Sequence, residues 1–235
     1  MKRNLLTIAV LGLLASVVLT ASGCKPKIYT DGTYKGISQA DSQYGYAIAE
    51  VTVQKDKITA AKLTEVTELG ADKDYAAYPY AKAKEANTEM AKRFVGKQDA
   101  NVDAYAGATN SSVKYKEAVS HALEKARKTP AVKSTYFDGT YFGRSPSTDS
   151  GYGIAFVTIQ ADKITAVKLD DVTEQNVLKD WPTYQYPKAL EAKDAMEKRF
   201  VEKNSGAVDT YAGATSSSSK WVVSVQEALK SAKVR

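Results

Sequence analysis

The stretch DAYAGATNSS, at Asp103–Ser112, returns almost unchanged as DTYAGATSSS at Asp209–Ser218. Each stretch joins an acid, an aromatic residue, a Gly-Ala pair and a threonine to a cluster of hydroxyls. A helix-like apolar pattern follows, so we expect a loop that ends at a helix N-terminus, where unpaired N–H groups and the helix dipole favour an anion such as phosphate. The alternative is a Ser or Thr N-cap after a flexible glycine. The predicted apolar faces comprise Val113, Ala118, Val119, Ala122 and Leu123, and then Val222, Val225, Ala228, Leu229 and Ala232.

The sequence around these stretches also repeats. The matching segments are DGTYKG at Asp31 with DGTYFG at Asp138, GYAIAEVTVQKDKITAAKL at Gly45 with GYGIAFVTIQADKITAVKL at Gly151, and YPYAKAKEANTEMAKRFV at Tyr78 with YQYPKALEAKDAMEKRFV at Tyr184. Two units of about a hundred residues each have a common domain size. We therefore predict one domain at 31–126, a linker at 127–137 that contains a proline and several charges, and a second domain at 138–235.

Within each unit the pattern of apolar residues changes from period two to helical spacing. DGTY predicts a turn and a short strand, and two further strands joined by the tight turns KDK or ADK predict a hairpin. The alternating strand residues are Ala47, Ala49, Val51 and Val53, and then Gly153, Ala155, Val157 and Ile159. The next segment has a helical stripe formed by Ala83, Ala86, Met90 and Phe94, and then by Ala189, Ala192, Met196 and Phe200. The order predicts a small α+β domain, a β-hairpin sheet with packed helices, used twice.

The N-terminus has the layout of a secretory signal. Lys2 and Arg3 precede an apolar run from Leu5 to Thr20, and small residues then lead to Cys24. LTASGC resembles the bacterial lipobox, which predicts a signal peptide at 1–23, lipid on Cys24 and a tether at 24–30. The alternative is an uncleaved membrane anchor, since the run could almost span a bilayer. Both interpretations place the protein at the cell membrane, on its extracytoplasmic face.

Composition and residue counts argue against several classes of function. The net charge of +6 includes Lys2 and Arg3, and the other charges of both signs are interspersed, which gives nucleic-acid binding little support. A single cysteine allows no disulfide framework and no cysteine-based metal site. The only histidine, His121, aligns with Glu227, so we expect no catalytic residues and no metal ligands. Asp170 and Asp171 have no equivalent pair in the first unit and are interpreted as surface charge.

The motif D-x-Y-A-G-A-T-x-S-S between two helices resembles that of FMN-binding domains that carry flavin covalently on threonine. Such domains occur in the sodium-pumping NADH:quinone reductase and in the related Rnf complex. Two of them behind a lipobox look most like the Gram-positive flavolipoproteins of extracellular electron transfer. The family pattern is roughly D-x-x-(S/T)-G-A-T, and a separate flavin transferase that uses FAD and magnesium attaches FMN to its threonine.

The resemblance implies a covalent FMN on Thr109 and another on Thr215, two per chain. The other matching residues are Asp103, Gly107 and Ala108, and then Asp209, Gly213 and Ala214. One position departs from the pattern, because Ala106 and Ala212 stand where the family usually has a hydroxyl. The hydroxyls expected to replace it are those of Ser111, Ser112, Ser216 and Ser217, with Ser111 and Ser217 the foremost candidates.

Aromatic residues beside the motif are candidates for contact with a flavin ring. Tyr105 and Tyr211 lie within the motif itself, and either stacking on the ring or packing against the protein would account for them. A second group precedes the long helix and comprises Tyr78, Tyr80, Tyr184, Tyr186 and Trp181. The sequence leaves both interpretations open.

Two functions remain. The first is a membrane-anchored, extracytoplasmic electron carrier that is matured by a flavin transferase. It would take electrons from a membrane NADH dehydrogenase or the quinone pool and pass them to extracellular acceptors or reductases. The alternative is a surface binding or structural lipoprotein of related fold without flavin. In both, the chain is no enzyme, its anchor is membrane lipid through Cys24, and nucleic acid is no partner.

Overall fold

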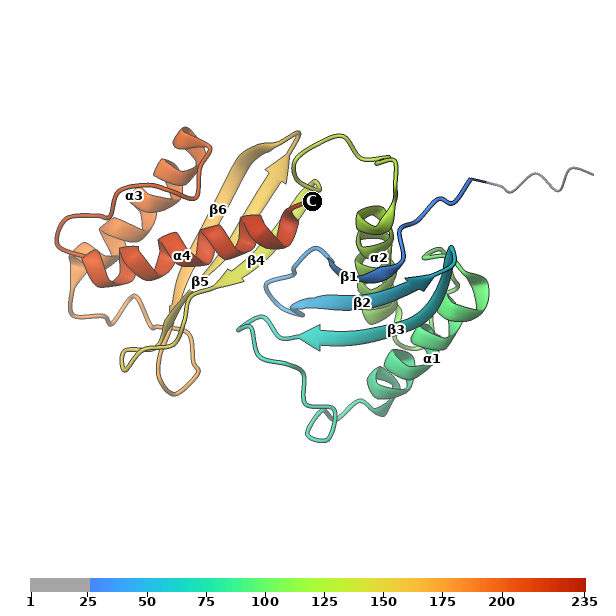
Figure 1. Ribbon diagram of the computed structural model, residues 1–235. Coiled ribbons are helices and arrows are strands. Elements are labelled where there is room, and N and C mark those ends of the chain that lie inside the picture. The colour runs from blue at the N-terminus through green and yellow to red at the C-terminus, as the bar shows by residue number, and fades with distance from the viewer. Residues whose placement is uncertain (1–25) are drawn as a thin grey trace, which may run out of the picture.

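The computed structural model describes residues 26–235, so the predicted signal peptide (1–23) and the predicted lipidation at Cys24 lie outside the described residues. Two similar units follow one another along this part of the chain (Figure 1). None of its helices is both long enough and apolar enough to cross a bilayer. The strands are β1 (Gly32–Ile37), β2 (Tyr46–Gln54), β3 (Lys57–Val66), β4 (Gly139–Arg144), β5 (Tyr152–Gln160) and β6 (Lys163–Val172). The helices are α1 (Ala81–Lys97), α2 (Thr109–Ala126), α3 (Pro187–Lys203) and α4 (Thr215–Ala232).

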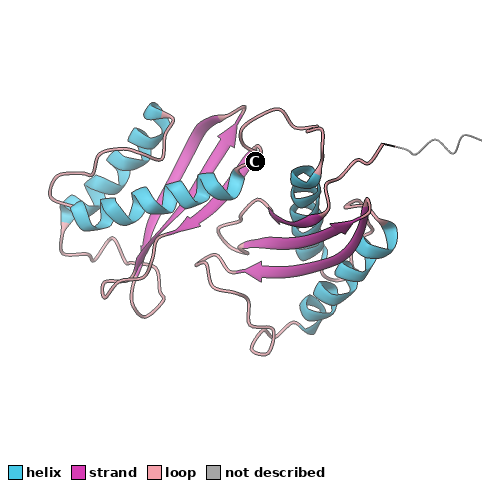
Figure 2. Ribbon diagram, in the orientation of Figure 1, coloured by secondary structure: helices cyan, strands magenta, loops and turns pink. Residues whose placement is uncertain are grey.

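Each unit is a three-stranded antiparallel sheet with two helices packed against it (Figure 2). The strand orders are β1-β2-β3 in the first copy and β4-β5-β6 in the second. The alternating strand residues predicted from the sequence point to the helices, and nearly all are fully buried. The expectation of an α+β fold used twice is therefore confirmed.

The hairpin turns have the same backbone conformation in both copies. Lys55 and Asp56 have φ values of 52° and 66°, and Ala161 and Asp162 have φ values of 48° and 62°. A two-residue loop with positive φ at both positions matches the right-handed twist of its strands. The tight turns predicted at KDK and ADK are therefore present.

The backbone just before each predicted unit is hydrogen-bonded to that unit. The carboxylate of Asp56 accepts hydrogen bonds from the backbone N–H groups of residues 28 and 29, at 2.9 and 2.7 Å. Asp162 does the same for residues 135 and 136, at 3.0 and 2.9 Å. Residues 28 and 29, predicted as tether, and residues 135 and 136, predicted as linker, are thus bound to their units by the aspartate of each hairpin turn.

The second glycine of DGTY-x-G lets a helix lie directly on the first strand. A Cβ on Gly36 would come within 1.9 Å of the carbonyl oxygen of Ala118 in α2. A Cβ on Gly143 would come equally close to the carbonyl oxygen of Ser224 in α4. These contacts leave no space for any side chain, so the repeated glycine sets the distance between helix and sheet.

The buried faces of the helices match the predicted stripes except at Val113 in α2, which is exposed, and at Val222 and Leu229 in α4, which are partly buried. All four predicted residues of α1 and all four of α3 are buried. Val113 in α2, in contrast, is 57% exposed, and Tyr115 is fully buried instead. Val113 lies five residues before Ala118, which turns it well away from the face of Ala118 at 3.6 residues per turn. Tyr115, three residues before Ala118, is on that face.

A paired exchange distinguishes the two cores. The first copy packs Tyr115 where the second packs Trp221, and both side chains are fully buried. The strand position that is Ala47 in the first copy is Gly153 in the second, where a Cβ would lie 3.1 Å from the indole of Trp221. The smaller strand residue accompanies the larger helix residue, so the close packing is preserved.

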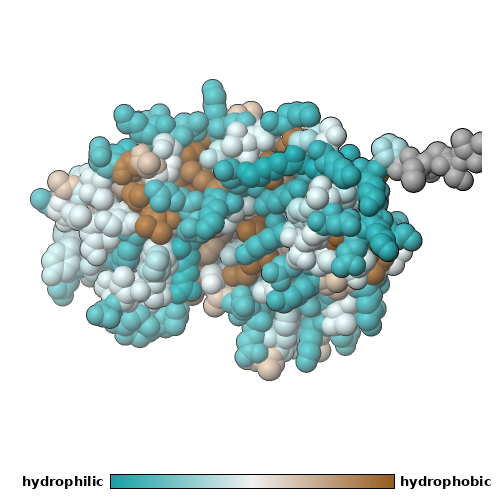
Figure 3. Space-filling model, viewed as in Figure 1, coloured by the Kyte–Doolittle hydropathy of each residue, from teal (hydrophilic) through white to brown (hydrophobic). Residues whose placement is uncertain are grey.

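The two copies are in direct contact. The ring of Tyr46 stacks on Phe142 with 5.5 Å between centroids. The hydroxyl of Tyr152 donates to the carbonyl oxygen of Leu69 at 3.1 Å, and the guanidinium of Arg144 lies 3.6 Å from the Tyr152 ring centroid. These residues form a small apolar cluster on the sheet face of the second copy that its helices leave free. In the space-filling view, hydrophobic residues show only in patches among mostly hydrophilic side chains (Figure 3).

His121 makes a further contact between the copies and predicts a pH dependence of stability. Its ring stacks on Phe137 at 3.7 Å, and its Nδ1 donates to the carbonyl oxygen of Ile37 at 2.7 Å. Burial lowers the pKa of His121, and the bond to Ile37 and the charge of Glu117 only partly oppose this. Because the folded pKa lies below the unfolded value near 6.5, the unfolded chain binds more protons as the pH falls.

The free energy of unfolding should therefore be constant above about pH 6.5 and decrease as the pH falls from there through the folded pKa. Urea unfolding at a series of pH values between neutral and mildly acidic measures this. His121→Gln keeps a donor for Ile37 and cannot titrate, so its curves should lose the dependence in this window. An unchanged dependence in that variant would assign it to other groups.

Candidate functional site

The motif stretches form loops that end at helix N-termini, as predicted. Gly107 and Gly213 both have φ of 85°, a left-handed conformation that favours glycine. Thr109 and Thr215 are the first residues of α2 and α4.

The cap positions of these helices are Ala108 and Ala214, and no side chain in the described part of the protein caps either helix. The alternative interpretation of the motif as a Ser or Thr N-cap is therefore wrong. Both threonine side chains are exposed instead.

Serine hydroxyls inside the first turn hold the loops in shape. Ser112 donates to the carbonyl oxygen of Ala108 at 2.8 Å and accepts from the N–H of Tyr105 at 2.9 Å. Ser218 makes the same two bonds in the second copy, at 2.8 and 3.1 Å. Ser112 was expected as a replacement hydroxyl for a ligand, but its hydroxyl is already used within the loop.

The leading acids of the motif are exposed, and arginines bind the backbone next to them. Arg93 in α1 donates to the carbonyl oxygens of Asp103 and Ala104, at 2.8 and 3.1 Å. Arg199 in α3 donates to the carbonyl oxygen of Asp209. The arginines were not among the predicted residues, although both copies have them in the shared segment KRFV.

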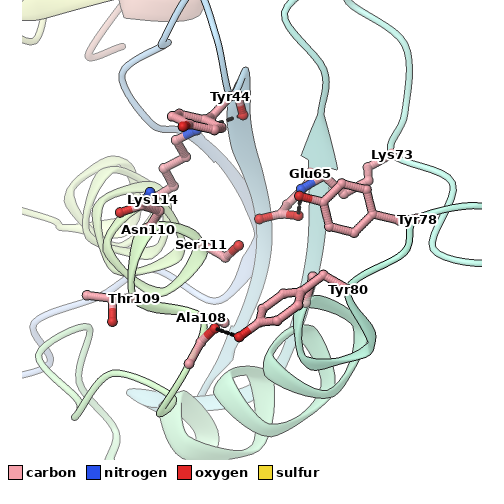
Figure 4. A pocket seen from close by; sticks show the side chains of 12 residues that line it. Tyr44, Glu65, Lys73, Tyr78, Tyr80, Ala108, Thr109, Asn110, Ser111 and Lys114 are labelled. Carbon is pink, nitrogen blue, oxygen red and sulfur yellow. Dashed lines mark hydrogen bonds and ion pairs between the residues drawn. The ribbon is translucent and has the colours of Figure 1, made fainter.

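A pocket of about 350 Å³ opens beside the first motif loop (Figure 4). Thr109 lies at its edge, at the start of α2, while the side chain of Ser111 points into it toward Glu65. The remaining walls come from the end of β3, from the segment after it and from the loop before β2. Its lining residues are Tyr44, Glu65, Lys73, Tyr78, Tyr80, Ala83, Gly107, Ala108, Thr109, Asn110, Ser111 and Lys114.

A buried carboxylate with a lysine partner forms the floor of this site in the first copy. Glu65 is 4% exposed, and the ammonium of Lys73 lies 2.6 Å from its Oε2. Lys114, on α2, donates to the carbonyl oxygen of Tyr44 at 2.7 Å, and its burial lowers its pKa.

The second copy has the same arrangement around Asp171, which is 1% exposed. Its Oδ2 lies 2.8 Å from Lys179 and 3.8 Å from Lys220 and accepts from the Ser217 hydroxyl at 2.8 Å, while Oδ1 has no hydrogen-bond partner among residues 26–235. The interpretation of Asp171 as surface charge is wrong, because it lies near the end of β6 and contacts side chains of α4 there. Its counterpart in the first copy is Glu65.

The aromatic residues divide into those at the pocket and those outside it. Tyr78 and Tyr80 line the pocket, and so does Tyr44, which was not predicted. Tyr105 lies outside: its hydroxyl donates to Glu85 at 2.8 Å, and the guanidinium of Arg93 lies 5.7 Å from its ring.

In the second copy, Tyr211 packs against the core. Trp181 lies 5.9 Å from Tyr184 and 6.1 Å from Trp221 between ring centroids. The two motif tyrosines therefore pack against the protein, while Tyr78 and Tyr80, which precede the long helix of the first copy, line the pocket.

Comparison with known proteins identifies the family. The family model described as FMN-binding domain matches residues 45–124 and again residues 151–230. No curated protein matches the chain. A crystal structure of a protein from Clostridium perfringens matches with 27% identity over 42% of this chain and 89% of that chain, at a TM-score of 0.37. Because the two family matches together span more than half of the sequence, the chain belongs to the FMN-binding domain family, with two copies of that domain in tandem.

Proposed function

We propose that Thr109 and Thr215 each carry one FMN through a phosphoester and that the protein is an electron carrier. Membership of the family indicates a flavoprotein. The observation that supports the attachment is the exposed threonine at the uncapped start of a helix in both copies. There the first N–H groups and the helix dipole favour the phosphate, and an outside enzyme can reach the hydroxyl.

The surrounding residues fit this group. The left-handed Gly107 lets the backbone approach a phosphate closely. Lys82 lies against that glycine, since a Cβ there would be 2.8 Å from its Cδ, and Lys188 takes the same place beside Gly213. The pocket next to Thr109 has the volume of a small-ligand site and mixes tyrosines with a few charged groups, as such sites do.

Attachment requires a separate flavin transferase. A threonine hydroxyl is a weak nucleophile unless a base activates it. The only histidine, His121, donates to Ile37 and is packed on Phe137 between the two copies. It is therefore bound elsewhere and serves as no base for Thr109.

FMN, when bound, supplies the electron transfer, and the chain positions it and sets its electrostatic surroundings. The helix N-terminus binds the phosphate end. In the first copy, Glu65 and its lysine partner place fixed charges beside the pocket. In the second copy, Asp171 and its lysine partner do so at the matching positions. The proposed donor is a membrane NADH dehydrogenase or the quinone pool, and the proposed acceptors are extracellular.

The test is to produce the chain with and without a flavin transferase and to denature it before measuring flavin. With the transferase, two flavins per chain should remain with the denatured protein, and the folded protein should be reduced and reoxidised reversibly. Without the transferase, none should remain. A chain that stays colourless with an active transferase would favour the alternative, a lipoprotein of the same fold without flavin.

We further propose that lipid on Cys24 anchors the protein to the outer face of the membrane. A Cys24→Ser variant should then move from the membrane to the soluble or secreted fraction, because it lacks the thiol that carries the lipid. Fractionation and blotting of cells that express each form measure this. A Cys24→Ser protein that stays in the membrane would instead indicate an uncleaved apolar segment.

A further inference from the structure

The two motif loops differ in the residues around them. Tyr44 lines the pocket of Thr109, and its backbone carbonyl is bound by Lys114 (Figure 4). The matching position in the second copy is Ser150, whose carbonyl is bound by Lys220 at 3.3 Å. The backbone and its lysine contact are thus the same, while an aromatic side chain stands at this position in the first copy only.

A second tyrosine contacts the motif loop in the first copy, and its counterpart in the second copy does not. The hydroxyl of Tyr80 donates to the carbonyl oxygen of Gly107 at 2.7 Å, so its ring lies across the pocket beside the motif (Figure 4). Tyr186 is the residue of the second copy that aligns with Tyr80. It is 68% exposed against 47% for Tyr80, and within residues 26–235 its hydroxyl makes no hydrogen bond to the motif loop.

The charged groups of the two sites, in contrast, are matched. Each has one buried carboxylate, Glu65 or Asp171, and a lysine that forms an ion pair with it. Each also has a further lysine in the second turn of its helix. The two sites therefore have the same number of these acidic and basic side chains, and they differ in the tyrosines that surround them.

We infer that Thr109 and Thr215 hold FMN in unequal surroundings: Tyr44 and Tyr80 enclose the first flavin, and the second is open to solvent. The inference rests on the proposed function. Aromatic side chains beside a planar ring contribute contact and exclude water. The second copy is then the site of electron exchange with soluble molecules, and the first copy is the shielded site.

The test uses two single-flavin chains, Thr215→Ala and Thr109→Ala, each produced with a flavin transferase. Quenching of the flavin fluorescence lifetime by iodide reports access to the ring. The quenching constant should be several-fold smaller for flavin on Thr109. Reoxidation by a soluble protein acceptor should be slower for that chain too.

Exchanging the residues at positions 44 and 150 between the copies should also exchange the order of the two quenching constants. Tyr44→Ser in the Thr215→Ala chain should raise the quenching constant toward that of the second site, and Ser150→Tyr in the Thr109→Ala chain should lower it. Both positions are exposed, so neither change threatens the fold. The control is Val113→Ser, an exposed apolar residue of α2 outside the pocket, whose counterpart is Ser219. It should change nothing.

Equal quenching in chains that each carry one covalent flavin would overturn the inference and leave the proposed function intact. So would a Tyr44→Ser change without effect. Absence of covalent flavin from both single-threonine chains would overturn the proposed function and this inference with it.

Discussion

A chain with both Thr109→Ala and Thr215→Ala is expected to carry no covalent flavin, while each single variant keeps one. Both hydroxyls are exposed and neither caps its own helix, so their loss should change the free energy of unfolding by less than about 0.5 kcal/mol. Intact-mass spectrometry after production with the transferase should show two FMN additions in the wild type, one in each single variant and none in the double variant.

Conservative and neighbouring substitutions distinguish the attachment site. Thr109→Ser and Thr215→Ser retain a hydroxyl at the start of the helix and should restore at least part of the additions. Ser111→Ala should leave both additions in place. If two additions persist in the double alanine variant, attachment is at the neighbouring serines, with Ser111 and Ser217 the first to examine.

The second large effect is expected from Gly143→Ala. The new Cβ would lie 1.9 Å from the carbonyl oxygen of Ser224 and 2.3 Å from the N–H nitrogen of Ala228, both in the backbone of α4. A backbone cannot rotate away as a side chain can, so α4 must move off the sheet. Overpacking of a core commonly costs about 1–3 kcal/mol, and this contact should cost at least about 3 kcal/mol.

Urea or thermal unfolding measures this loss, which for a domain of this size corresponds to a fall in melting temperature of roughly 15 °C. Gly36→Ala should do the same to the first copy. The control is Gly96→Ala in α1, where a Cβ would meet nothing within 4 Å in the described part of the chain. That change should stabilise the helix by about 0.5–1 kcal/mol. A Gly143→Ala protein as stable as the wild type would mean that α4 lies farther from β4.

The elements of the fold could be predicted from the sequence because their signals are local. Each signal lies within one short, continuous segment. Examples are the period-two run from Ala47 to Val53 and the helical stripe through Met90 and Phe94. The mistaken assignment of Val113 has a physical reason. Valine counts as apolar and tyrosine as ambiguous, but the angular position of Tyr115 on α2 decided which of the two is buried.

The site was predictable only in part. The motif loop is one continuous segment, so its threonines could be named as candidates from a resemblance. Glu65 and Lys73 reach the site from β3 and the segment after it, and only tertiary packing brings them to the start of α2. A signal was available, because the acid is retained as Asp171 and the lysine of α2 as Lys220. A comparison of the two repeats position by position would have found it. Tyr44, which has no aromatic counterpart in the second copy, has no such signal.

The exchange of Tyr115 with Ala47 for Trp221 with Gly153 also bears on how the repeats can evolve. Two adjacent gene segments of similar sequence can recombine. A crossover between the strand and the last helix would combine Trp with Ala in one copy and would press the indole against a methyl group. The other product would combine Tyr with Gly and leave a gap. Selection against both products would keep each helix inherited together with its own strand, and the two copies would then diverge as whole units.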